Sequence, residues 1–129
     1  MKFDVMMLML LALVAPAASA GPLKLESNGG LYTLSVEGVD QLDAREFHAL
    51  QITVNCRPRR CERLDLRFTA RMPDHGHGQN YAPKVSQQAP GRFRVEGVRF
   101  HMPGYWEVYL DLVDRESAML ERTQFSLEL

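Results

Sequence analysis

Strict alternation of apolar and polar side chains over residues 64–72 is the feature that most constrains the fold. Every second residue of this stretch is apolar, and successive side chains of a β-strand point to opposite faces of a sheet. Residues 48–54 and 106–112 show the same period of two, and the alternation is cleanest in the latter. The pattern predicts antiparallel strands with one buried face and one solvated face.

Other short apolar runs, separated by Gly, Pro or polar turn residues, supply the rest of the predicted fold. These runs are residues 23–26, 31–36, 81–88, 93–102 and 119–129. The period slips at Glu96-Gly97, which predicts a β-bulge at the glycine. About seven short strands without an amphipathic helix predict an all-β fold, a single antiparallel β-sandwich.

The first twenty residues have the pattern of a secretory signal. Lys2 precedes an uncharged apolar run over residues 5–14, and Ala18-Ser19-Ala20 resembles a cleavage sequence. The run is too short to cross a bilayer as a helix. We therefore expect a signal peptide over residues 1–20 and a mature one-domain protein, residues 21–129, in the periplasm. The net charge of −1 gives no reason to expect a nucleic-acid partner.

Cys56 and Cys61 are the two cysteines of the chain and are separated by four residues. In an exported protein this spacing favours a disulfide bond across a short turn. Two thiolate ligands for a metal ion are the alternative, which an oxidising compartment disfavours.

Residues 72–78, Met-Pro-Asp-His-Gly-His-Gly, carry two of the four histidines. The proline and the two glycines predict a loop with unusual backbone angles. Imidazole is a common ligand for zinc and copper, and two imidazoles in such a loop can converge on one ion. Solvated loop histidines without a ligand are the other interpretation.

Antiparallel strand directions predict which residues meet. If the cysteine turn lies at one end of the sandwich, the strand over residues 64–72 delivers the histidine loop to the other end. The strand from residue 92 then rises to that same end, and the strand over residues 48–54 begins there. Six side chains should gather at this pole: His48, Met72, His75, His77, His101 and Met102.

A mixed set of imidazoles and thioethers suits copper, and zinc bound by imidazoles is the competitor. We expect His75 and His77 to be the first metal ligands and His101 the next, followed by Met102 and Met72. Both methionines fall on the core-facing phase of their strands, so each is also explained as a core residue. No nucleophile lies in a catalytic context, and we expect no enzyme.

Residues 72–78, Gly91-x-Phe93 and residues 100–108 (Phe-His-Met-Pro-Gly-Tyr-Trp-Glu-Val) resemble the YtkA-like domain family, which is related to the FixH-like periplasmic proteins. The resemblance implies an immunoglobulin-like β-sandwich and an association with copper handling or respiratory-oxidase maturation. Gln79 stands where many members have methionine.

Two functions are consistent with these features. The first is an exported metal-binding sandwich, a copper carrier or accessory protein. The second is a non-catalytic interaction module that docks a periplasmic or membrane protein through the glycine–histidine loop without a metal.

Overall fold

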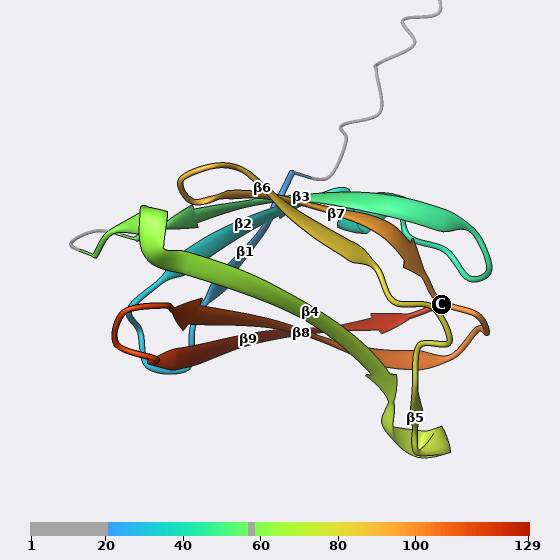
Figure 1. Cartoon of the computed structure of the whole chain (residues 1–129). Coiled ribbons are helices and arrows are strands. Elements are labelled where there is room, and N and C mark those ends of the chain that lie inside the picture. Colours follow the sequence, from blue (N-terminus) through green and yellow to red (C-terminus); the bar gives the residue numbers. More distant parts are fainter. Residues whose placement is uncertain (1–20, 57–58) are drawn as a thin grey trace, which may run out of the picture.

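Two antiparallel sheets stack face to face around one hydrophobic core (Figure 1). The computed structural model describes residues 21–56 and 59–129. The first sheet has the strand order β1-β2-β3-β7-β6 and the second has the order β5-β4-β8-β9. The predicted all-β sandwich is confirmed.

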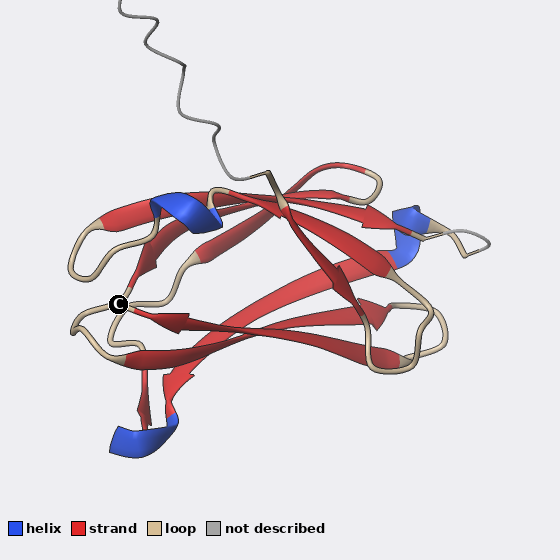
Figure 2. Cartoon of the chain, turned by 180° about the vertical axis from the view of Figure 1, so that it is seen from behind, coloured by secondary structure: helices blue, strands red, loops and turns tan. Residues whose placement is uncertain are grey.

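The described residues form nine strands, where the sequence predicted about seven. They are β1 (Leu23–Glu26), β2 (Thr33–Glu37), β3 (Phe47–Asn55), β4 (Leu64–Met72), β5 (His77–Gly78), β6 (Lys84–Ala89), β7 (Arg92–Arg99), β8 (Tyr105–Asp114) and β9 (Leu120–Glu128). Three single-turn 3-10 helices connect them (Figure 2): η1 (Val39–Gln41), η2 (Cys61–Arg63) and η3 (Pro73–His75). Among the described residues, no helix has the length and apolar character needed to cross a membrane.

Strand β5 corrects the expectation that residues 72–78 form a loop throughout. After η3, Gly76 adopts a left-handed conformation with φ of 68°, and the chain turns back beside β4. Arg71 then pairs with Gly78, and Met72 pairs with His77. The segment of η3 and β5 projects beyond the body of the sandwich at the end opposite the cysteine turn (Figure 1).

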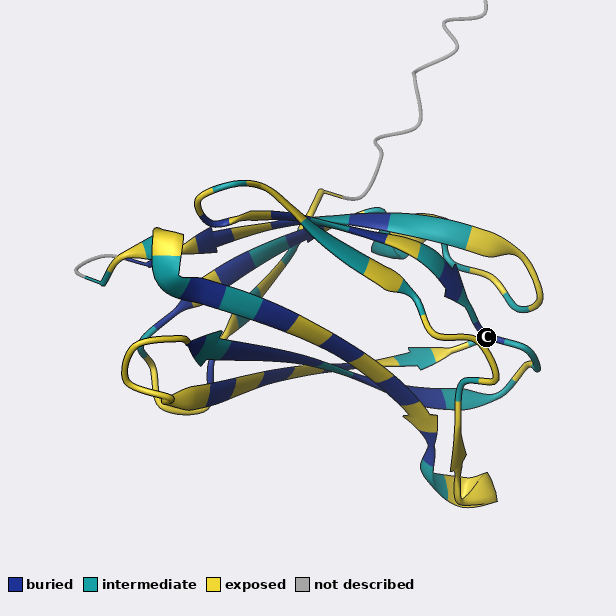
Figure 3. Cartoon of the chain, in the orientation of Figure 1, coloured by how far each residue is buried: buried dark blue, intermediate teal, exposed yellow. Residues whose placement is uncertain are grey.

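The alternation that predicted β4 matches its burial residue by residue. Buried positions alternate with positions that are exposed or half-buried from Leu64 to Met72, and the same banding is visible along the ribbon (Figure 3). In β8, Trp106, Val108 and Leu110 are completely buried. These inward rows, from β4 and β8, form most of the second sheet's contribution to the core.

The predicted β-bulge at Gly97 is confirmed. His48 of β3 pairs with Val98 and the next residue pairs with Glu96, which leaves Gly97 as the extra residue of β7. Its φ is 73°, and a Cβ at this position would lie 2.9 Å from Cε1 of Tyr81. Glycine is therefore required by both the backbone angle and the packing of the tyrosine ring.

The predicted disulfide bond joins Cys56 and Cys61, whose Cα atoms are 5.4 Å apart. Residues 57–58 of this turn and the predicted signal segment, residues 1–20, lie outside the described residues. The disulfide packs against Gly91, which has a φ of 74°. A Cβ there would lie 2.6 Å from Sγ of Cys61 and 2.8 Å from the carbonyl oxygen of Val54.

Substituting Gly91 tests this packing. Gly91→Ala should lower the free energy of unfolding through backbone strain and through the clash with the disulfide. Gly76→Ala is the matched control, because Gly76 has a similar φ of 68° but nothing within 4 Å of a Cβ. We expect about 1 kcal/mol of strain in both variants and at least about 1 kcal/mol more in Gly91→Ala. Urea unfolding measures both, and equal losses would contradict the packing.

Candidate metal centre

His77 lies at the outer end of a row of side chains that crosses the second sheet. Residues directly opposite in an antiparallel pair point to the same face, so His77 and its partner Met72 face the same way. Arg71 pairs with Glu107, and one further step of this register places Met72 opposite Trp106. The row His77, Met72, Trp106 therefore faces inward, with the methionine and the tryptophan buried.

His101 reaches the same place from the connection between β7 of the first sheet and β8 of the second. It follows Phe100, which comes directly after β7 and is completely buried. The indole ring of Trp106 contacts both side chains, with centroid distances of 5.2 Å to Phe100 and 5.4 Å to His101. Regular strand geometry ends at Arg99, so period-two phase no longer sets the direction of His101. Its Nδ1 atom is buried.

Three imidazoles lie in a chain of contacts at this pole. The ring centroids of His75 and His77 are 5.7 Å apart, and those of His77 and His101 are 5.2 Å apart. Two imidazoles that bind one ion through nitrogens at about 2 Å have centroids about 5 to 6 Å apart. The two spacings are therefore those of rings able to share an ion.

Hydrogen bonding leaves one nitrogen available on each of the two central rings. Nδ1 of His77 lies 3.1 Å from the carbonyl oxygen of Gly78. Because a carbonyl only accepts, this contact places the proton on Nδ1 and leaves the Nε2 lone pair free. Nδ1 of His101 is buried and has no hydrogen-bond partner among the described residues. An unpartnered buried nitrogen is costly, and a metal ion would satisfy it.

Local electrostatics favour the neutral, ligating form of His101. Burial, followed by the neighbouring His77 and Arg99, lowers the pKa of His101 below its usual value. Desolvation and nearby positive charge both disfavour an imidazolium. The ring is therefore unprotonated near pH 7, as a metal ligand must be.

Trp106 is the residue of this site that the sequence did not identify. Alternation predicted it as a core residue, and its complete burial confirms that prediction. The ring also contacts His77, at a centroid distance of 6.4 Å. Its Nε1 donates a hydrogen bond of 3.0 Å to the carbonyl oxygen of Met102. Strand alternation gives the face of a residue and not its neighbours. The contacts of the indole with His77 and Met102 therefore had no sequence signal.

The remaining candidate ligands occupy different environments. Met72 is buried in the core, and its terminal methyl group lies under Gly104, 2.7 Å from where a Cβ would stand. Met102 is half-buried against the core. His48 is at the same pole, but its Nε2 atom is 2.7 Å from Oδ1 of Asp43. His75 is exposed and reaches the cluster through His77.

Across residues 21–56 and 59–129, no group of three or more His, Cys, Asp or Glu side chains could hold a metal ion as it stands. The arrangement is instead a pair of imidazoles, His77 and His101. His75 is exposed beside this pair, and the thioether side chains of Met72 and Met102 lie on its core side. The five-residue ligand set predicted from the sequence stays a prediction.

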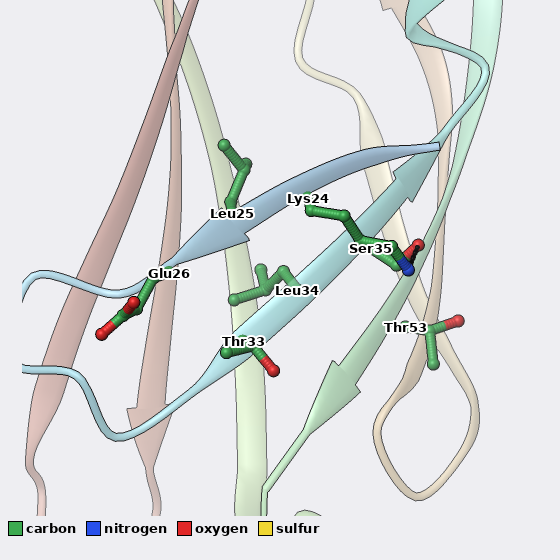
Figure 4. A pocket seen from close by; sticks show the side chains of 7 residues that line it. All are labelled: Lys24, Leu25, Glu26, Thr33, Leu34, Ser35 and Thr53. Atoms are coloured by element: carbon green, nitrogen blue, oxygen red, sulfur yellow. Dashed lines mark hydrogen bonds between the residues drawn. The ribbon is translucent and has the colours of Figure 1, made fainter. Parts of the chain in front are cut away.

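A surface hollow of about 470 Å³ lies elsewhere, on the first sheet (Figure 4). It is lined by residues of β1, β2 and β3: Lys24, Leu25, Glu26, Thr33, Leu34, Ser35 and Thr53. Nζ of Lys24 donates a hydrogen bond of 3.2 Å to Oγ of Ser35. The lining includes no histidine, methionine or cysteine, and it is not part of the histidine cluster.

An exposed aromatic pair flanks the histidine pole. Phe47 is 57% exposed and Tyr81 is 50% exposed, and their rings meet edge to face at 5.1 Å. The guanidinium of Arg99 lies 5.4 Å from the centroid of the Phe47 ring. The side chain of Gln79 donates a hydrogen bond of 2.9 Å to the carbonyl oxygen of Arg99. This link ties the segment after β5 to the segment that carries His101.

Comparisons with protein-family models, with curated proteins and with solved structures gave no match to the chain. The resemblance to the YtkA-like family, carried by residues 72–78 and 100–108, therefore stays a prediction. The same holds for export to the periplasm.

Two substitutions of Met72 separate its packing role from its sulfur chemistry. Met72→Ala should lower the free energy of unfolding by about 2 to 5 kcal/mol, because it leaves a cavity beneath Gly104. Met72→Leu keeps the volume and should cost less than about 1.5 kcal/mol. Chemical denaturation of both variants measures the difference. Indistinguishable stabilities would show that Met72 does not fill the end of the core.

Proposed function

We propose that this protein is an exported, non-catalytic metal carrier or accessory protein that binds a copper ion at the pole of its β-sandwich. The observation that carries the proposal is the pairing of His77 and His101. The His77 ring comes from β5 and the His101 ring from the connection between β7 and β8. The two rings lie 5.2 Å apart, and each keeps a nitrogen free of protein hydrogen bonds among the described residues. An ion bound there would join β5 to the connection between β7 and β8.

The side chains around the pair support copper over zinc. Met72 lies beside His77 in the cross-strand row, and Met102 is half-buried near Trp106. Thioether and imidazole ligands together suit copper, whereas zinc in proteins is bound by imidazoles, thiolates and carboxylates. The two cysteines are joined in a disulfide and offer no thiolate.

The exposure of two of the candidate ligands is consistent with a protein that delivers its metal ion to another protein. His75 and His77 are exposed, and β5 is held to β4 by two residue pairs. A ligand on such a short strand can approach an acceptor protein without opening the core. The disulfide bond and the predicted signal segment are consistent with export. The resemblance to YtkA-like domains points to copper handling or respiratory-oxidase maturation as the setting.

Metal titration of the purified apo-protein tests the proposal. Wild-type protein should bind one equivalent of copper, and His77→Ala/His101→Ala should lower the affinity by at least about a hundredfold, or about 2.7 kcal/mol. The loss follows because the variant removes both rings whose spacing of 5.2 Å fits a shared ion. Competition with a chromophoric copper chelator gives the affinity.

His48→Ala is the matched control, because His48 lies at the same pole but is engaged by Asp43. It should bind copper as the wild type does. Equally weak binding by the wild type and the double variant would refute the proposal. A loss of similar size in His48→Ala would place the ion elsewhere.

The exposed aromatic pair favours a second function, an interaction module that binds a periplasmic or membrane protein without a metal. Aromatic and arginine side chains dominate binding energy at protein interfaces. Phe47, Tyr81 and Arg99 form such a group next to the glycine–histidine loop. Gly76, with its left-handed turn, would shape the loop for docking.

Partner capture separates the two functions. In a pull-down from a cell-envelope extract, the interaction module predicts that Phe47→Ser/Tyr81→Ser and Gly76→Ala/Gly78→Ala each lose the captured protein. His77→Ala/His101→Ala should retain it, because no ion takes part. Capture that instead depends on the histidines and on added copper would contradict this second function.

A further inference from the structure

The candidate site has a defined inner wall. The row of inward-facing side chains across β5, β4 and β8 ends on Trp106, whose indole contacts both central imidazoles. The interplanar angles are 68° to His77 and 82° to His101, so the imidazoles meet the indole edge to face. This ring closes the protein side of the space between them.

The indole is held in place and cannot swing away. Its Nε1–H donates to the carbonyl oxygen of Met102, and the ring packs on Phe100 at 5.2 Å. The side chain is completely buried. A close-packed ring with its polar atom satisfied is a rigid boundary.

An ion shared by His77 and His101 would lie within reach of that ring. The three centroid distances are 5.2, 5.4 and 6.4 Å. They place the point midway between the two imidazoles about 5 Å from the indole centroid, inside the range of about 6 Å for cation–π contacts. The indole therefore takes one side of the ion that water or a further ligand would otherwise occupy.

We propose that the centre selects copper in its cuprous state, held by His77 and His101, with the Trp106 indole as its inner wall. This inference rests on the proposed function and adds the oxidation state and a role for the tryptophan. Cuprous copper is soft, accepts few ligands and tolerates an aromatic or thioether neighbour. Zinc and cupric copper require more ligands than the pair supplies.

Tryptophan emission tests the inference directly, because Trp106 is the single tryptophan of the chain. The apo-protein is titrated without oxygen with cuprous copper in a competing chelator, with silver(I) as a redox-inert soft monovalent probe, and with zinc(II). Both monovalent ions should quench tryptophan emission, with saturation at one equivalent. They should also bind at least about tenfold more tightly than zinc.

Variants check the assignment. Trp106→Phe keeps an aromatic ring but loses the Nε1 hydrogen bond, and it should weaken silver binding by about threefold or more. The wild-type emission remains decisive if this variant does not fold. His48→Ala should retain both the quenching and the preference for monovalent ions.

The outcomes separate this inference from the proposed function. Zinc binding as tight as silver binding would overturn the selectivity. Silver binding that requires His77 and His101 but leaves the emission of Trp106 unchanged would overturn the role of the indole. Both results leave a metal-binding protein in place. Failure of every ion to bind would remove the inference and the proposed function together.

Discussion

The contact between Phe100 and Trp106 determines the geometry of the histidine pole. Phe100 directly follows β7 and Trp106 belongs to β8, and these two completely buried rings meet at 5.2 Å. The chain between them makes the turn that carries His101, and the turn is fastened by the hydrogen bond from Trp106 to Met102. Burial of aromatic area is among the largest stabilising contributions in a small core. The position of His101 follows from a contact that the fold needs for its own stability.

The position of His77, the second residue of the site, depends on the same core. Met72 is the last residue of β4, lies next to Trp106 in the inward row and is closed over by Gly104. The backbone of Gly104 exchanges hydrogen bonds of 2.7 and 3.0 Å with Leu129, which brings the end of the second sheet to this turn. His77 is anchored to Met72 by strand pairing. The core thus positions both His77 and His101, although His77 itself is exposed.

Much of this arrangement could be predicted from the sequence. Period-two alternation identified the inward faces of β4 and β8, the phase slip located the bulge at Gly97, and the cysteine spacing indicated the disulfide. Strand directions alone brought the segment of residues 75–77 and His101 to one pole. These features succeed because antiparallel connectivity and side-chain alternation are properties of the local chain.

Other features depend on contacts that no local pattern encodes. The Asp43–His48 pair forms across a loop in which Arg45 has a φ of 78°, an unusual angle for a residue other than glycine. The two residue pairs of β5 depend on the left-handed turn at Gly76. The packing of Trp106 against two histidines depends on how the sheets stack. Alternation gives the face of each residue, and only the stacked sheets determine its neighbours.

The central claim is that His77 of β5 and His101 of the connection between β7 and β8 share a single ion. Side-chain nitrogen NMR of histidine-labelled protein tests it most directly, because each ring reports its own protonation and ligation. On addition of one equivalent of silver(I), the account predicts that the signals of His77 and His101 shift together and that the signal of His48 stays in place. A shift of only one of the two rings, or equal shifts of all four histidines, would contradict it.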